Sequence, residues 1–284
     1  MPSSLVVTPG EFAHQVGQGQ LFPAEFRWRF LAEGDSWMDR SAVVSPSLPH
    51  YLAREFDRRG ESALIVNLAQ FGDTMRRIGS VVEGEFASWV DFLHVDAILL
   101  SAGGNDFIDA ARDPGPGQGL LRDLRHAPPP AQGRDCLRAD ALASLVTDYL
   151  DPNFARLVDA VRGSAKNAAT PIFLNNYDTP TARPAPATAG GRTWLHEAYT
   201  ANGIPEALWP GLTAAVFNEL QAAIAGWQIG RDGLHGVPTD DTLTPAAPGS
   251  TGCNGDWLNE IHPNARGWRK LASVWADAVL LRRA

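Results

Sequence analysis

The sequence is poor in lysine and cysteine, and it lacks any long apolar run. Only two of its 284 residues are cysteine, and only two of its 24 basic residues are lysine. No apolar run reaches the roughly 18 residues of a membrane-spanning helix. The N-terminus also lacks the basic start and following apolar stretch of a secretory signal. We therefore expect a cytoplasmic protein without a transmembrane segment.

The net charge of −8 at pH 7 argues against polyanionic partners. Proteins that bind nucleic acid neutralise its phosphates with clustered lysine and arginine, and the sequence has no such cluster, so we expect no nucleic-acid partner. Cys136 and Cys253 are 117 positions apart and could form one bridge, although unpaired thiols are favoured. Neither has the neighbours of a metal site, and the sequence indicates no metal and no cofactor.

Apolar residues make up 44% of the chain, enough to fill a large core. Short apolar runs with a β preference alternate with helical periodicity, which is typical of a parallel sheet covered on both faces. The predicted strands are 29–33, 63–69, 97–102, 171–175 and 234–238, and the predicted helices are 47–59, 78–92, 139–162, 210–227 and 265–281. The sequence thus predicts one α/β domain over residues 1–284, a three-layer α/β/α sandwich with a five-stranded, mainly parallel sheet.

Two segments interrupt this alternation. Residues 113–134 and 180–192 are dense in proline and glycine, which favours loops over helices or strands. Because long loops inside compact domains are often functional, we expect at least one of these insertions to border the substrate site.

Polar residues stand at four places along this pattern. Residues 34–37, 72–74 and 103–106 follow the first three predicted strands, and residues 256–263 precede the last helix. Each segment alone is explained by turn and helix-cap chemistry. Open α/β sheets, however, bind ligands at the carboxyl ends of their strands. Four such segments at one sheet edge therefore predict a functional site.

In this order the four segments resemble the sequence blocks of the SGNH hydrolases, also called the GDSL esterase and lipase family. Ser36 in EGDSW takes the place of the family's nucleophile, and His262 takes that of its general base. Gly72 and Asn105 take the places of its oxyanion-hole donors. The resemblance spans residues 34–263 and implies a flavodoxin-like fold that hydrolyses carboxylic esters, in either small-molecule or polymeric substrates.

These residue types suit that chemistry. A serine hydroxyl becomes a good nucleophile when an imidazole accepts its proton, so Ser36 and His262 must lie within hydrogen-bond reach. The tetrahedral oxyanion needs donors, and the backbone N–H groups of Ser36 and Gly72 with the side-chain amide of Asn105 would supply three. A side chain at position 72 would crowd the approaching substrate oxygen.

The sequence departs from the family at the third member of the triad. The family has an acid three residues before the histidine, but Asn259 occupies that position here. Asn259 could orient the imidazole through its carbonyl oxygen, Asp256 could reach it around the turn, or a backbone carbonyl could serve a Ser–His dyad. We favour Asn259, although an amide stabilises imidazolium less than a full charge does.

Two other functions compete with ester hydrolysis. The missing acid is compatible with a non-catalytic acyl- or glycan-binding protein on the same fold. The segment GDSWMD also resembles part of a metallophosphoesterase motif, but the histidines of that motif are missing around it.

Overall fold

The computed structural model describes residues 2–40, 46–82, 85–112 and 115–282, and its centre is a parallel sheet. The strands are β1 (Leu5–Val7), β2 (Trp28–Gly34), β3 (Ala63–Asn67), β4 (Ala97–Ser101), β5 (Ile172–Asn175) and β6 (Leu234–Val237). Their order is β1-β3-β2-β4-β5-β6, and every neighbouring pair is parallel. The predicted α/β fold is confirmed, but with six strands: the five predicted strands are β2 to β6, and β1 adds an edge.

The strands are buried because they are apolar throughout. Every residue of β3 and β4 is buried, as expected where a parallel sheet is covered on both faces. Without β1, the strand order is that of flavodoxin-like folds. In these folds the direction in which strands are added reverses at the strand that comes first in the chain. Here that strand is β2, which has β3 on one side and β4 on the other.

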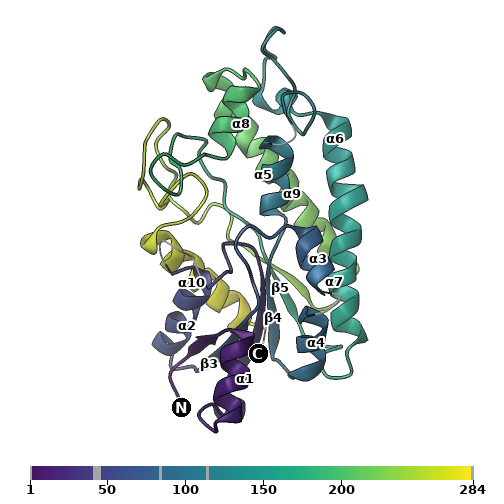
Figure 1. Ribbon diagram of the computed structural model, residues 1–284, viewed down its shortest axis with the longest axis vertical. Helices are drawn as coiled ribbons and strands as arrows, with labels where there is room; N and C mark the ends of the chain where they lie inside the picture. Colours follow the sequence, from purple (N-terminus) through teal and green to yellow (C-terminus); the bar gives the residue numbers. More distant parts are fainter. Residues whose placement is uncertain (1, 41–45, 83–84, 113–114, 283–284) are drawn as a thin grey trace.

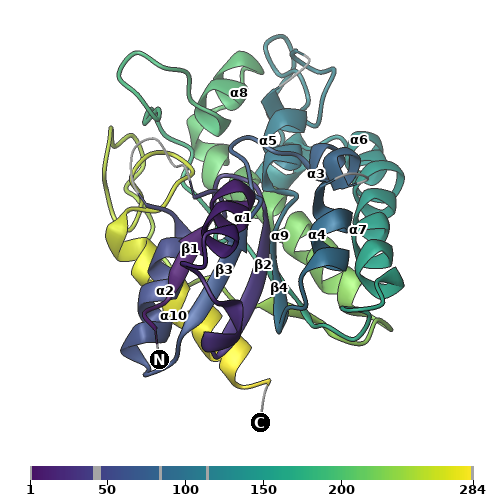
Figure 2. The same cartoon turned by 60° about the horizontal axis from the view of Figure 1, so that its bottom comes forward.

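Helices form a layer on each face of the sheet (Figures 1 and 2). On one face α2 (Leu48–Arg58) packs against α10 (Ala265–Leu280). On the other face α3 (Met75–Val82) and α4 (Glu85–Phe92) pack against α7 (Asp151–Gly163). The long helix α9 (Trp209–Gln228) lies beside α7, where the Trp227 and Phe154 rings stack with centroids 4.2 Å apart.

The remaining helical segments are short. They are α1 (Pro9–Gly17), α5 (Gly104–Arg112), α6 (Ala139–Ala143) and α8 (Leu195–Ala201), a π-helical stretch at Ser144–Leu150, and single 3₁₀ turns at Pro23–Glu25, Gly133–Cys136 and Glu206–Leu208. The predicted helix 78–92 is two helices, α3 and α4, and positions 83 and 84 between them lie outside the described residues. Sequence reasoning missed α1, α5 and α8.

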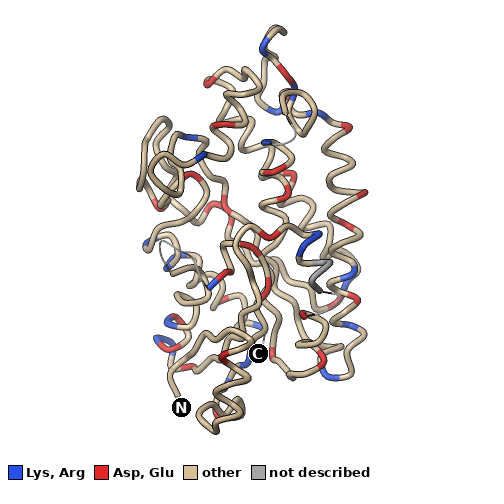
Figure 3. Tube along the Cα trace, in the orientation of Figure 1, with Lys and Arg blue, Asp and Glu red and all other residues tan. Residues whose placement is uncertain are grey.

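The two proline- and glycine-rich insertions hold little regular structure. Residues 115–132 and 180–192 contain no helix or strand, and positions 113 and 114 lie outside the described residues. Lys, Arg, Asp and Glu are interspersed along the trace (Figure 3). Within the described residues, no helix is long and apolar enough to span a membrane. Cys136 is buried, Cys253 is exposed, and both are free thiols.

The carboxyl end of β2 is pressed against β4. The backbone of Gly34 has a φ of +144°, and a Cβ atom there would lie 2.1 Å from the carbonyl oxygen of Ser101. The N–H of Asp35 then donates to that same oxygen at 2.9 Å. Only glycine permits this approach, so the chain leaves the sheet at Gly34 and turns directly into the segment that carries Ser36.

Candidate active site

Ser36 and His262 meet at the carboxyl edge of the sheet. Ser36 follows β2, and His262 lies in the loop before α10, yet the Ser36 Oγ and His262 Nε2 atoms are 2.8 Å apart. The loop is held in place because Trp37 donates its indole N–H to the carbonyl of Ile261 at 3.1 Å. At its end the Asn264 side chain caps α10 by accepting the N–H groups of residues 266 and 267.

Asn259 is the residue that contacts the other ring nitrogen. Its Oδ1 atom lies 3.1 Å from His262 Nδ1, and it also accepts the backbone N–H groups of Ile261 at 3.1 Å and His262 at 2.8 Å. Because those two donors require an oxygen, the amide orientation is fixed. An acceptor at Nδ1 places the ring proton there, which leaves Nε2 free to accept the proton of Ser36.

Asp256 does not take the orienting position. Its carboxylate is ion-paired with Arg266 and, at 2.6 Å, with Lys270, and it accepts the backbone N–H of Thr244 at 2.7 Å. Burial alone would raise the pKa of Asp256, but these partners hold it below its ordinary value. Because Arg266 and Lys270 of α10 pair with the Asp256 carboxylate, this geometry does not support the hypothesis that Asp256 reaches around the turn to His262.

Two of the groups expected in an oxyanion hole line the same recess, and the third, Gly72, precedes a residue that one of them contacts. Ser36 and Asn105 line one recess, and Asn105 donates a side-chain N–H to the carbonyl of Asp73 at 2.9 Å, beside Gly72. Among the described residues, the backbone N–H groups of Ser36 and Gly72 have no acceptor. Gly72 has a φ of +77°, and a Cβ there would meet nothing within 4 Å. Glycine is therefore favoured by the backbone itself, and the space beyond it is open.

A buried carboxyl group supports the segment that carries Ser36. Asp35 accepts the N–H of Trp37 and the hydroxyl of Ser101, each at 3.0 Å, and the hydroxyl of Tyr177. Burial raises the pKa of Asp35 to about 7 despite these donors. The turn and cap role expected for this aspartate agrees with its bond to the N–H of Trp37.

Asp106, in the first turn of α5, supports the oxyanion side in a similar way. It accepts the N–H of Met75 at 2.9 Å, and burial raises its pKa to about 6. This bond ties the start of α5, which carries Asn105, to the start of α3, which follows Gly72. The two sequence segments that supply expected oxyanion donors are therefore fastened to each other.

Two aromatic side chains beside His262 were missed by sequence reasoning. The Phe71 ring lies parallel to the imidazole with centroids 6.1 Å apart, and the Trp194 ring meets it edge-on at 5.5 Å. Burial in these surroundings lowers the pKa of His262 to about 4. The proline- and glycine-rich insertion at residues 180–192 leads into the site, because Trp194 lies just after it in the sequence. No periodicity or motif marks either position.

Glu260 fastens that insertion to the histidine loop. Its fully buried carboxylate accepts the backbone N–H groups of Trp194 at 2.6 Å and His196 at 2.7 Å. The fully buried guanidinium of Arg183 donates to the carbonyl of Asn259 at 2.6 Å. Burial raises the pKa of Glu260 to about 7. The Glu260 carboxyl thus holds the backbone beside His262 in place and does not contact the imidazole.

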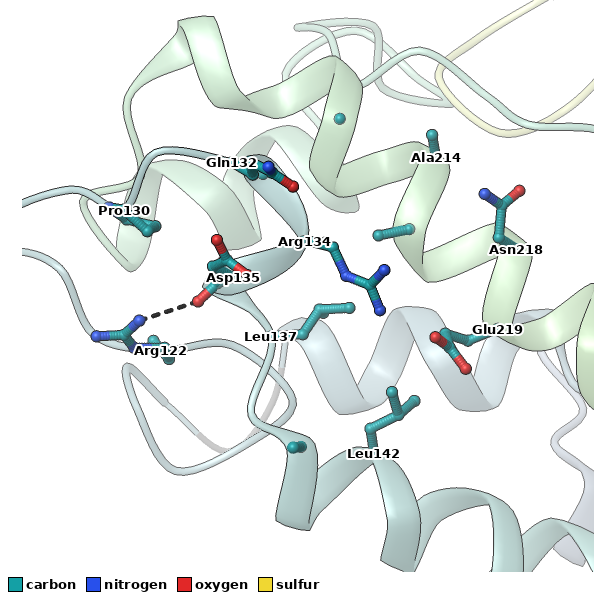
Figure 4. A pocket seen from close by; sticks show the side chains of 14 residues that line it. Arg122, Pro130, Gln132, Arg134, Asp135, Leu137, Leu142, Ala214, Asn218 and Glu219 are labelled. Atoms are coloured by element: carbon teal, nitrogen blue, oxygen red, sulfur yellow. Dashed lines mark hydrogen bonds between the residues drawn. The ribbon is translucent and has the colours of Figure 1, made fainter.

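A larger cavity lies away from this site. It has a volume of about 860 Å³ and separates α9 from residues 122–142, with the Arg134 side chain pointing into it (Figure 4). None of the predicted site residues line it. Over the described ranges, no three His, Cys, Asp or Glu side chains are grouped to hold a metal ion.

Comparison with known proteins identifies a sequence family and a fold. The model of the GDSL-like lipase/acylhydrolase family matches residues 32–270. No curated protein matches the chain. Among solved structures, the lipase Lip_vut3 from a goat rumen metagenome is 13% identical with a TM-score of 0.54, covering 88% of this chain and 97% of its own.

Two further solved structures are similar over most of their length. A protein designated a GDSL-like lipase from Parabacteroides merdae is 12% identical with a TM-score of 0.50, covering 89% of this chain and 96% of its own. A family 3 carbohydrate esterase from Clostridium thermocellum is 12% identical with a TM-score of 0.48, covering 90% and 96%. At these identities, the likeness to the two structures with TM-scores of 0.54 and 0.50 concerns the fold.

Proposed function

Because the chain belongs to the GDSL-like lipase/acylhydrolase family, we propose that it hydrolyses carboxylic esters with Ser36 as nucleophile and His262 as general base. The observation that carries the proposal is the 2.8 Å contact between Ser36 Oγ and His262 Nε2. That contact lies at the carboxyl edge of the sheet, where open α/β folds place their sites.

The reaction runs in two halves. His262 Nε2 takes the proton of Ser36 as Oγ attacks the ester carbonyl carbon, and the imidazolium then protonates the departing alkoxide as the tetrahedral intermediate collapses. The alcohol leaves, and an acyl-serine remains. A water molecule then attacks that acyl group with His262 as base, and the carboxylic acid leaves as the proton returns to Oγ.

The oxyanion of each tetrahedral intermediate needs donors that are already in place. We assign these to the N–H groups of Ser36 and Gly72 and to the Asn105 amide. In support, the two backbone groups have no acceptor within the described part of the chain. The Asn105 amide nitrogen has two N–H donors and uses one of them for the carbonyl of Asp73. The other is available to the substrate oxygen.

Asn259 takes the orienting role in this proposal. Its oxygen holds Nδ1–H through a neutral hydrogen bond, which fixes the ring but offers imidazolium no full counter-charge. The low pKa of His262 is consistent with that neutral partner. The ring therefore remains unprotonated, and able to accept a proton, at mildly acidic pH.

Covalent labelling tests the proposal directly. A fluorophosphonate probe should modify the wild-type protein at Ser36 with one equivalent, and p-nitrophenyl acetate should be hydrolysed. Ser36→Ala should lose both properties, whereas Ser144→Ala, which changes an exposed helical serine, should keep them. An acyl- or glycan-binding protein would leave the probe unreacted, and that result would overturn the proposal.

A further inference from the structure

The two sides of Ser36 are built differently. In the reaction proposed above, His262 must reach the leaving oxygen in order to protonate it. The alcohol part of the ester therefore lies on the His262 side, and the acyl chain extends away from it. The recess beside Ser36 that contains Asn105 does not include His262 in its lining, so it is the place for the acyl chain.

That recess is narrow. Its volume is about 10 Å³, roughly the room that one water molecule needs. Large side chains enclose it, namely Trp37, Ile108, Tyr177, Pro180, Phe217 and Ile261. A methyl group is of similar size to a water molecule, so an acetyl group fills this space and a longer acyl chain exceeds it.

The walls of the recess are held in place. The hydroxyl of Tyr177 is bonded to Asp35 and to Ser101, and a Cβ on Gly104 would lie 2.8 Å from its ring. The Trp37 indole contacts the rings of Trp257 and Trp268 at centroid distances of 6.1 and 5.4 Å. Displacing close-packed side chains of this kind to admit a larger group costs free energy.

The opposite side of Ser36 is open. Phe71, parallel to the imidazole, is 59% exposed. Trp194, edge-on to the same ring, is half-buried. An alcohol leaving past His262 thus meets solvent and two aromatic faces, where a large apolar or ring-shaped group gains contact.

We infer that this enzyme selects steeply for acetyl-sized acyl groups and tolerates large alcohols. The inference rests on the proposed function, because it needs Ser36 as nucleophile and His262 on the leaving side. It names the substrate class of the site as acetate esters of bulky alcohols.

A pair of isomeric esters tests the inference. 2-Phenylethyl acetate carries its ring on the alcohol side, whereas ethyl phenylacetate carries it on the acyl side, and both release simple alkoxides. We expect kcat/KM for the acetate to be higher by about 10- to 100-fold, the ratio for overfilling a packed site. Similar values for the two isomers would overturn the inference.

A variant locates the selectivity in the recess. Phe217 is 3% exposed in α9, and Phe217→Leu should enlarge the recess and reduce the isomer ratio at least threefold. Phe154→Leu is the matched control, since Phe154 is also a buried helical phenylalanine but lies outside the recess, and it should keep the wild-type ratio. Ile108→Ala gives a second route to the same enlargement if Phe217→Leu does not fold. An unchanged ratio in an enlarged, folded variant would contradict the inference.

The two proposals fail in different ways. If the folded protein hydrolyses neither isomer nor p-nitrophenyl acetate and resists the fluorophosphonate probe, the proposed ester hydrolysis is wrong. If it hydrolyses both isomers equally, ester hydrolysis stands and only the acyl selectivity is wrong.

Discussion

The strand end that carries Ser36 and the loop that carries His262 use their carboxyl groups differently. Beside Ser36, Asp35 is bonded to Trp37, Ser101 and Tyr177 and so supports the turn that carries Ser36. Beside His262, cations on α10 hold Asp256, and backbone N–H groups hold Glu260. The imidazole of His262 has instead a neutral amide, that of Asn259, as the partner of its Nδ1 atom.

This comparison teaches that closeness in sequence does not assign an acid to a histidine. Asp256 and Glu260 are both fully buried and both lie within six residues of His262. A buried carboxylate needs cations or N–H donors, and here the fold supplies them away from the ring. Asn259 is the remaining candidate because its oxygen already sits in the turn that positions the histidine.

The largest expected effect concerns the proposed general base, which moves a proton in both halves of the reaction. His262→Ala should lower kcat for p-nitrophenyl acetate by about 10⁴-fold or more, because Ser36 would lose its base. His14→Ala, on the exposed face of α1, serves as the control. A His262→Ala enzyme of near wild-type rate would contradict the assignment of His262 as general base.

A smaller loss is expected on the Ser36 side. Asn105→Ala removes one assigned oxyanion donor and should lower kcat by about 10²–10³-fold, with less effect on KM. Asn218→Ala, an exposed asparagine of α9, should leave kcat unchanged. An Asn105→Ala loss confined to KM would mean that the amide binds the ground state and the transition state equally, so that it would not be an oxyanion donor.

The contrast between Asn259 and Asp256 should be smaller again, but it addresses the histidine side directly. Asn259→Ala should lower kcat by about 10- to 100-fold, because a hydrogen bond to a charged ring is lost. Asp256→Ala should keep kcat and instead lower the melting temperature, because Lys270 and Arg266 lose their partner. The reverse pattern would make Asp256 the orienting acid.

The pH profile should show the smallest and most diagnostic change. With the His262 pKa near 4, kcat/KM should stay level as pH falls from 8 and should decline only as the ring gains a proton near pH 4. Asn259→Asp places a carboxylate at Nδ1, which favours imidazolium and should raise that inflection by ~1–3 units. Asn218→Asp is the control. An unmoved inflection in Asn259→Asp would show that the side chain does not face the ring.

Much of the fold was predictable because the inner strands are continuous apolar runs. Residues 63–67 and 97–101 are buried throughout, and such runs leave little choice of structure. The edge strand β1 has only three residues and was missed. Helix α1 was missed although Thr8 and Glu11 form a capping box, a signal that the sequence does carry.

Part of the candidate site could be predicted from strand ends, whereas His262 and Asn259 were predicted from the resemblance to the SGNH hydrolases. Ser36, Gly72 and Asn105 each follow a strand, so the topology of the sheet brings them together. The partners of Asp256 depend on how α10 docks, although Arg266 and Lys270, four residues apart on one helix face, offered a signal. Phe71 and Trp194 approach His262 through loop packing, which no spacing rule describes.

The contact between Ser36 and His262 also has a consequence for folding. It joins residues 226 positions apart, so the two halves of the active site come from opposite ends of the chain. Contacts of such long range require closure of a large loop and form slowly relative to local structure. During refolding, the return of esterase activity should therefore lag behind the return of helical circular dichroism and should report the docking of α10.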